Sequence, residues 1–306
     1  MQGLRFFACA CAILLAGCST TGGPGAAGPA AFPTGAPVAV SPVSTARPLS
    51  EPPATPGPST TDATAASPEP APSAAPAGSV VIGFGPFDAQ TELISSSGRR
   101  VLIDVEYPDA LSRPPTARDI LLTTHEHADH YDQPFVASFP GQTLTMRAGT
   151  IEADGISVTG VPGQHNQDPL LSIPNYLFLV DIGGFRIAHL GDLGQTAFTA
   201  AQLRALGRVD VVIGQLTNGI SGIPGGSRIG IDLVNQLRPR LFIPTHLLED
   251  PVGTAKMASA EWPAFYTTKA WITLSRQTLP ETTTLVFMGD EAASYGKLTG
   301  VPVAPW

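Results

Sequence analysis

The stretch Ile120-Leu121-Leu122-Thr123-Thr124-His125-Glu126-His127-Ala128-Asp129-His130 joins an apolar run to a cluster of histidine and carboxylate side chains. The apolar run predicts a buried strand, whose end then places the cluster. In extended backbone the side chains of His125 and His127 point to the same side and can reach one cation. Asp129 and His130 follow where the strand turns into a loop or helix, and they offer two more ligands. Imidazole and carboxylate ligands suit zinc, manganese or iron.

Three more apolar runs end close to a residue that could bind the same cations, and these residues are His165, Asp192 and His246. Loops at strand ends are where rigid scaffolds display ligands, so the common placement predicts one shared site. The remaining histidine, His189, lies near Asp192. It either supports a ligating carboxylate from behind or is only a buried polar residue.

The hydrophobic pattern predicts β-rich runs first and helices alternating with strands later. We expect strands over Val80–Phe84, Thr91–Ser95, Arg100–Val105, Ile120–Thr123, Thr143–Arg147, Ile156–Val161, Tyr176–Asp181, Phe185–Leu190, Val209–Ile213 and Leu241–Ile243, and helices over Thr199–Leu206 and Ile229–Leu237. Turn signals at Asp154-Gly155 and Ile182-Gly183-Gly184 predict hairpins. The pattern indicates an α/β layered architecture built on two sheets.

The first 79 residues differ in composition from the rest. The apolar run Phe6–Ala16 is too short to span a bilayer but suits a signal peptide. Leu15–Cys18 resembles the bacterial lipoprotein processing box, which implies that residues 1–17 are removed and that Cys18 is acylated. An ordinary signal peptide or a buried apolar terminus is the alternative. Of residues 19–79, 52 are Pro, Ala, Ser, Thr or Gly, so residues 18–79 are expected to form a disordered tether.

These features predict an extracytoplasmic protein that a lipid anchor holds on a bacterial membrane, the outer membrane if the cell is Gram-negative. Residues 80–306 suffice for one large domain. They lack cysteine, which excludes a disulfide scaffold, an iron–sulfur cluster and a cysteine nucleophile. They carry 15 basic and 22 acidic residues without a basic stripe, which argues against nucleic acid as a partner. The glycine-rich stretch Asn218–Gly230 lacks the Lys-Ser/Thr of a phosphate-binding loop, and is a surface loop or a mobile lip.

Over residues 80–306 the order and spacing of these motifs resemble the metallo-β-lactamase superfamily of metal-dependent hydrolases. The resemblance implies a four-layer αββα sandwich with the site at one edge of the two sheets. It also implies two divalent metal ions, with zinc favoured over manganese or iron. The implied ligands are His125, His127 and His165 for the first metal, Asp129, His130 and His246 for the second, and Asp192 bridging both. The Gly191-Asp192 turn looks closest to the lactonase-like and phospholipase D-like branch.

The resemblance and the chemistry together predict a metal-dependent hydrolase that activates water to attack a small ester, lactone or phosphodiester. Asp129 is expected to act both as a ligand and as the acceptor that orients the water. The substrate would be a small or lipid-like molecule, and the lack of a cysteine ligand argues against a β-lactam. Two alternatives stay open: a nuclease-type phosphodiesterase, and a cell-surface lipoprotein that binds metal or a metabolite without catalysis. The acidic domain disfavours the first, and the presence of all seven ligands disfavours the second.

Overall fold

The structure of the chain is a computed structural model that describes residues 71–85, 89–168, 170 and 172–305. The predicted signal peptide, Cys18 and the tether as far as residue 70 lie outside the described residues. Just before the first strand, Ala75 is buried against Val81 and Ile94, and its N–H donates to the Ser95 carbonyl at 3.0 Å. The described structure therefore already makes core contacts before Val80, where the sequence predicts the domain to begin.

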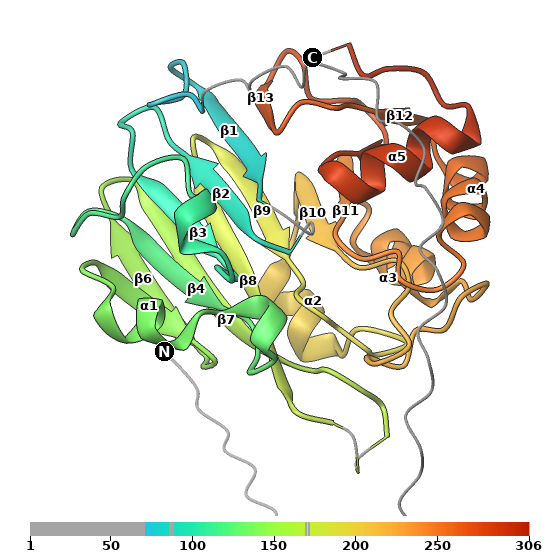
Figure 1. The fold of residues 1–306 in the computed structure, drawn as a ribbon, viewed down its shortest axis with the longest axis horizontal. Coiled ribbons are helices and arrows are strands. Elements are labelled where there is room, and N and C mark those ends of the chain that lie inside the picture. Colours follow the sequence, from blue (N-terminus) through green and yellow to red (C-terminus); the bar gives the residue numbers. More distant parts are fainter. Residues whose placement is uncertain (1–70, 86–88, 169, 171, 306) are drawn as a thin grey trace, which may run out of the picture. The chain divides into compact units, whose positions relative to one another are not determined.

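Six strands form the first sheet (Figure 1). In spatial order they are β13 (Trp271–Ser275), β1 (Ser79–Phe84), β2 (Thr91–Ile94), β3 (Arg100–Ile103), β4 (Ile120–Thr123) and β5 (Gln142–Thr145). Strands β1 to β3 pair antiparallel, whereas β3, β4 and β5 run parallel. The carboxyl ends of these last three strands therefore meet at one edge of the sheet.

Eight strands form the second sheet. In spatial order they are β12 (Ala264–Tyr266), β14 (Thr284–Phe287), β11 (Leu241–Pro244), β10 (Val211–Gly214), β9 (Phe185–His189), β8 (Pro174–Ile182), β7 (Ile156–Gln164) and β6 (Gly149–Ala153). Strands β9, β10 and β11 run parallel, and β8 is antiparallel to both β7 and β9. Strands β7, β9, β10 and β11 thus all end at the same edge.

The two sheets pack face to face, and the five α-helices within the described residues cover their outer faces. The helices are α1 (Gln133–Ser138), α2 (Ala200–Leu206), α3 (Ile229–Leu237), α4 (Pro251–Glu261) and α5 (Asp290–Thr299). Helix α1 packs on the first sheet, and the other four pack on the second. The predicted four-layer αββα sandwich is therefore confirmed. Among the described residues, no helix has the length and apolar character needed to cross a bilayer.

Along the central strands, successive side chains point alternately into the core between the sheets and toward the helices on the outer faces. On β4, Ile120 and Leu122 belong to the core between the sheets, while Leu121 packs with α1 on the outer face. On β10, Val211 belongs to the core between the sheets and Val212 packs toward the helices. Successive strand residues point to opposite faces, so a continuous apolar run predicts a strand that is covered on both sides.

A buried ion cluster fixes the segment between β3 and β4. The side chain of Arg100 is fully buried and donates to Glu92 Oε2 at 2.8 Å and to Asp119 Oδ2 at 3.0 Å. Its guanidinium also donates to the carbonyl oxygens of Arg113 and Pro114, at 2.9 and 3.1 Å. One arginine thereby satisfies two buried carboxylates and holds the connecting loop against the sheet.

Replacing Arg100 with leucine removes the ion-pair partner of Glu92 and leaves Asp119 with the partly exposed Arg113. We expect the free energy of unfolding to fall by about 3–5 kcal/mol, because a buried carboxylate loses its counter-charge. Urea denaturation measures the loss. The control is Arg118→Leu, which removes an exposed ion pair with Asp154 at 3.8 Å and should cost less than about 1 kcal/mol. Equal losses in the two variants would contradict the assignment.

Candidate metal centre

The predicted ligands gather at the edge of the sandwich where strands of both sheets end. His125, His127, Asp129 and His130 follow β4, the last two within a 3-10 turn over Ala128–His130. His165 comes directly after β7, Asp192 three residues after β9, and His246 two residues after β11. These segments come close only because parallel strands bring their carboxyl ends to one edge.

The structure brings all seven residues together in three overlapping groups. Within each group the nearest ligand atoms lie within 4.8 Å of one another, and the groups are His125, His127 and His165; His125, His130 and Asp192; and Asp129, His130 and His246. The first and third groups match the two metal sites that the sequence resemblance implies. Asp192 shares the middle group with one histidine from each.

The two oxygens of the Asp192 carboxylate face different halves of the centre. Oδ2 lies 3.6 Å from His165 Nε2 and 4.0 Å from His125 Nε2. Oδ1 lies 3.5 Å from His130 Nε2 and 3.7 Å from His246 Nδ1. A carboxylate placed in this way can offer one oxygen to a cation in each half.

Several polar atoms of the centre are buried without a hydrogen bond to any described residue. They are His125 Nε2, His130 Nε2, both ring nitrogens of His165, and Asp192 Oδ1. An unsatisfied buried polar group costs about 1–3 kcal/mol, and these atoms converge on one another. Imidazole and carboxylate donors without a thiolate suit zinc, manganese or iron. The residues therefore fit a site that could hold metal ions.

Burial and neighbouring charges shift the pKa values of several groups in the cluster. Burial, together with the charge of neighbouring His130, lowers the pKa of His125 to about 3. Burial would also lower the pKa of His130, but the Asp192 and Asp104 carboxylates raise it well above its ordinary value. Burial opposes the charge on Asp192, yet His246 and His130 hold the pKa of that carboxyl well below its usual range. A neutral His125 and an ionised Asp192 are in the protonation states that metal ligands need, whereas His130 would have to release its proton to bind a cation.

Asp104 supports both halves of the centre, a role that no motif in the sequence indicated. Its carboxylate is fully buried, lies 2.9 Å from His130 Nδ1, and accepts hydrogen bonds from the backbone N–H and the hydroxyl of Thr124, both at 2.7 Å. The Thr124 hydroxyl is also 3.0 Å from His125 Nδ1. One carboxylate thus orients a histidine of each half. The predicted strand Arg100–Val105 ends earlier, at Ile103, and Asp104 takes a left-handed φ of 52°.

Glycines at both ends of the Asp192 turn allow the backbone to pass close to its neighbours. Gly191 has a φ of +53°, and a Cβ there would lie 2.5 Å from Asn175 Oδ1. A Cβ on Gly194 would lie 1.9 Å from the Ser221 carbonyl oxygen. Asn175 Oδ1 also accepts the Asp192 N–H at 3.2 Å. No larger residue fits either position with this backbone path.

The glycine-rich stretch from Asn218 contributes directly to the centre. Asn218 Nδ2 donates to Asp192 Oδ2 at 2.7 Å, and both side chains are buried. No pattern in the sequence singles out Asn218, because a single asparagine after a strand is not a motif. The structure shows that its amide fixes the orientation of the Asp192 carboxylate.

The side chain of His189 is buried behind the centre and contacts the backbone of the turn that carries Asp192. The Gly191 N–H donates to His189 Nδ1 at 3.2 Å, and His189 Nε2 lies 3.5 Å from the Thr91 hydroxyl. Burial lowers the pKa of His189 to about 4, so its ring is neutral at neutral pH. Its hydrogen bond therefore supports the backbone of the turn that carries Asp192, a position between the two alternatives that the sequence left open, support of a ligating carboxylate and a merely buried polar residue. Glu126, within the histidine motif, is exposed.

A cavity of about 260 Å³ opens beside the centre. Its lining residues are Ala89, Glu106, Tyr107, Asp129, Thr245, His246 and Leu248. Two of the seven clustered residues, Asp129 and His246, therefore face a space that a small molecule can enter. Asp129 is exposed, whereas Asp192 is buried.

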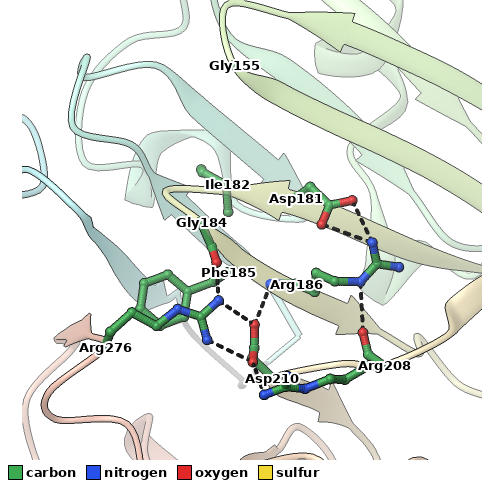
Figure 2. Close-up of a pocket in the computed structure, with 9 residues that line it drawn as sticks. All are labelled: Gly155, Asp181, Ile182, Gly184, Phe185, Arg186, Arg208, Asp210 and Arg276. Carbon is green, nitrogen blue, oxygen red and sulfur yellow. Dashed lines mark hydrogen bonds and ion pairs between the residues drawn. The ribbon is translucent and has the colours of Figure 1, made fainter.

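A second cavity, of about 400 Å³, is lined by charged side chains that pair with one another (Figure 2). The Arg276 guanidinium pairs with Asp210 at 2.9 and 3.0 Å and lies over the ring of Phe185, 4.7 Å from its centroid. Arg186 pairs with Asp181 at 3.3 Å. These residues join the β8–β9 turn to the start of β10, at the edge opposite the strand ends that carry the metal centre. None of the seven clustered residues lines this cavity.

Comparison with known proteins identifies relatives that share this part of the chain. A family model described as "Beta-lactamase superfamily domain" matches residues 87–246, a range that includes all seven clustered residues. A UPF0173 protein of Pyrococcus abyssi is 30% identical over 188 residues, which are 55% of this chain and 82% of the relative. A UPF0173 protein of Pyrococcus furiosus is 29% identical over 181 residues, covering 50% and 78%.

A solved structure agrees with the fold. A metallo-beta-lactamase superfamily protein from Thermotoga maritima superposes with a TM-score of 0.51 at 22% identity, over 68% of this chain and 98% of that one. At this level of identity the likeness supports the architecture and says nothing about the substrate.

Replacing Asp104 with asparagine would remove the charge that orients His130 and, through Thr124, His125. We expect the affinity for Zn²⁺ to fall by about 10–100-fold, as is usual for residues that hold metal ligands in place. Competition against a chromophoric chelator measures this affinity. The control is Glu126→Gln, which changes an exposed carboxylate in the adjacent loop and should leave the affinity unchanged. Native affinity in Asp104→Asn would show that Asp104 does not support the centre.

Proposed function

The chain belongs to the beta-lactamase superfamily, and from that premise we propose that it is a metal-dependent hydrolase with a dinuclear centre. The observation that carries the proposal is the set of buried, unpaired nitrogen and oxygen atoms that converge beside an open pocket. A buried polar cluster of this kind is costly unless it binds something. Its placement next to a cavity suits chemistry on a small molecule.

Each half of the centre would hold one divalent cation, with zinc favoured over manganese or iron. The proposed ligands are His125, His127 and His165 in one half, Asp129, His130 and His246 in the other, and Asp192 facing both. When bound, two such cations would lower the pKa of a water molecule and polarise a substrate oxygen. The protein supplies the spacing of the ligands and a buried setting in which charges interact strongly.

We propose that Asp129 orients the attacking water. Its carboxylate lies near His130 and His246 and also lines the pocket. It can therefore accept a hydrogen bond from a water molecule and hold that molecule toward the substrate. Asp192 is buried, and its Oδ2 already accepts a hydrogen bond from Asn218, so it is less suited to this role.

The proposed substrate is a small or lipid-like ester, lactone or phosphodiester. A pocket of about 260 Å³ accommodates one substituent of such a molecule. The ligand set contains no cysteine, which supports placing the chain near the lactonase-like and phospholipase D-like branch and speaks against a β-lactam substrate. The net negative charge of the chain, −8, disfavours polynucleotides.

We also propose that Cys18 is acylated and anchors the protein outside the cytoplasm on a bacterial membrane. The support is the Leu15–Cys18 box followed by a long segment rich in proline and alanine. Such a tether would let the catalytic domain reach substrates at or near the membrane surface.

Protein purified without chelators is expected to contain about two equivalents of transition metal by elemental analysis. It should hydrolyse members of a panel of chromogenic esters, lactones and phosphodiesters. Asp129→Asn should lower kcat by about 10²–10⁴-fold, the range for general acid–base groups, and His125→Ala should lose metal as well as activity. Glu126→Gln serves as the matched control and should retain both.

Two results would count against the hydrolase. Hydrolysis that persists at the native rate in His125→Ala would show that the centre is not the catalyst. Metal binding without hydrolysis in the zinc, manganese and iron forms would support a binding lipoprotein instead.

Replacing Cys18 with serine tests the anchor. The native chain should incorporate labelled fatty acid in bacterial cells and sediment with membranes, whereas Cys18→Ser should do neither. Cys11→Ser keeps the processing box intact and is the control. Membrane association of Cys18→Ser would exclude anchoring by this residue.

A further inference from the structure

Four residues of the pocket beside the metal centre neither belong to the centre nor adjoin it in the sequence. They are Ala89, Glu106, Tyr107 and Leu248. Together they bring a carboxylate, an aromatic ring and aliphatic side chains to the space that a substrate would occupy. No lysine or arginine is among the described residues that line this pocket.

Glu106 and Tyr107 are held in position by hydrogen bonds on both sides. The carbonyl of Val105 accepts the Asp132 N–H at 2.8 Å, which ties this loop to the segment after the histidine motif. The Tyr107 N–H donates to Gln90 Oε1 at 2.9 Å, and Gln90 is buried. These hydrogen bonds fix the path of the backbone that carries Glu106 and Tyr107.

The side chains of Glu106 and Tyr107 also contact each other. A hydrogen bond with the Glu106 carboxylate raises the pKa of Tyr107, and the Asp129 carboxylate acts on the phenol in the same direction. Tyr107 is therefore a neutral phenol near two carboxylates. A cation that enters the pocket would meet these charges and the ring together.

Such a combination is the chemistry that recognises an alkylammonium ion. The carboxylate attracts the charge, the ring face attracts a cation through its quadrupole, and the side chains of Ala89 and Leu248 cover the alkyl groups. A second anionic group placed close to Glu106 would be repelled by its carboxylate.

We propose that the substrate of this site carries a substituted ammonium group, which Glu106 and Tyr107 bind while its ester, lactone or phosphodiester bond faces the metal centre. This inference rests on the proposed hydrolase function. It narrows the substrate to cationic or zwitterionic molecules and assigns Glu106 as the residue that sets the preference.

Binding of two matched probes to the zinc-loaded full chain tests the proposal without turnover. Choline and 3,3-dimethylbutan-1-ol have the same shape and differ by one positive charge. NMR titration of ligand line widths measures each dissociation constant. We expect choline to bind at least about fivefold more tightly than its neutral isostere.

Variants separate the contributions of the two residues. Glu106→Gln should bring choline and its isostere within about twofold of each other, and Tyr107→Leu should weaken choline, whereas Tyr107→Phe keeps the ring and should retain the preference. Glu281→Gln removes an exposed carboxylate that does not line the pocket and should behave as the native chain. The Tyr107 variants test the site independently if Glu106→Gln fails to fold.

Equal binding of choline and its isostere by the native chain would overturn the proposal, as would a full preference in Glu106→Gln. Failure of the proposed function has a different signature, because it would appear as absent hydrolysis of every substrate in the panel whatever the binding result. If esters are cleaved, butyrylthiocholine should have a lower KM than S-(3,3-dimethylbutyl) thiobutyrate, and this difference should disappear in Glu106→Gln.

Discussion

One constraint governs the edge of the sandwich where the seven clustered residues lie, and it is the buried carboxylate of Asp192. It lies between histidines that follow β4, β7 and β11, with one oxygen toward each half of the centre. A charge in this position is tolerated only among groups that can balance it, because desolvation of an unpaired carboxylate is expensive. The surrounding imidazoles do so in part through His130, and the polar atoms around it that lack a partner among the described residues could complete the balance by binding a cation.

The rest of the edge holds this arrangement in a fixed orientation. Asp104 positions His130 and, through Thr124, His125, while Asn218 fixes the carboxylate itself. His189 supports the backbone of the Asp192 turn. The opposite edge is built differently, since its arginines and aspartates pair with one another and connect loops (Figure 2). The charged groups at the opposite edge thus pair with one another, whereas several buried polar atoms of the metal centre have no hydrogen-bond partner among the described residues.

Elements with strong local patterns could be predicted, and weakly patterned ones could not. Ile120–Thr123 and Ile229–Leu237 were predicted with the bounds that the structure shows. No element was predicted after His246, where α4 has little amphipathic character and β12 has three residues. Strand β13 joins the first sheet by pairing with β1, almost two hundred residues earlier. Such pairing depends on the closure of the whole sandwich and leaves no local periodicity to detect.

The amino-acid sequence by itself determined which side chains could bind metal. The spacing of His125 and His127 and the position of each ligand after an apolar strand are local properties, which backbone geometry converts into direction. Only the tertiary structure decided the supporting residues Asp104 and Asn218 and the pocket wall of Glu106 and Tyr107. Their roles arise from hydrogen bonds and cavities between segments distant in the chain, and a single aspartate, asparagine or tyrosine in a loop carries no signal until folding gives it neighbours.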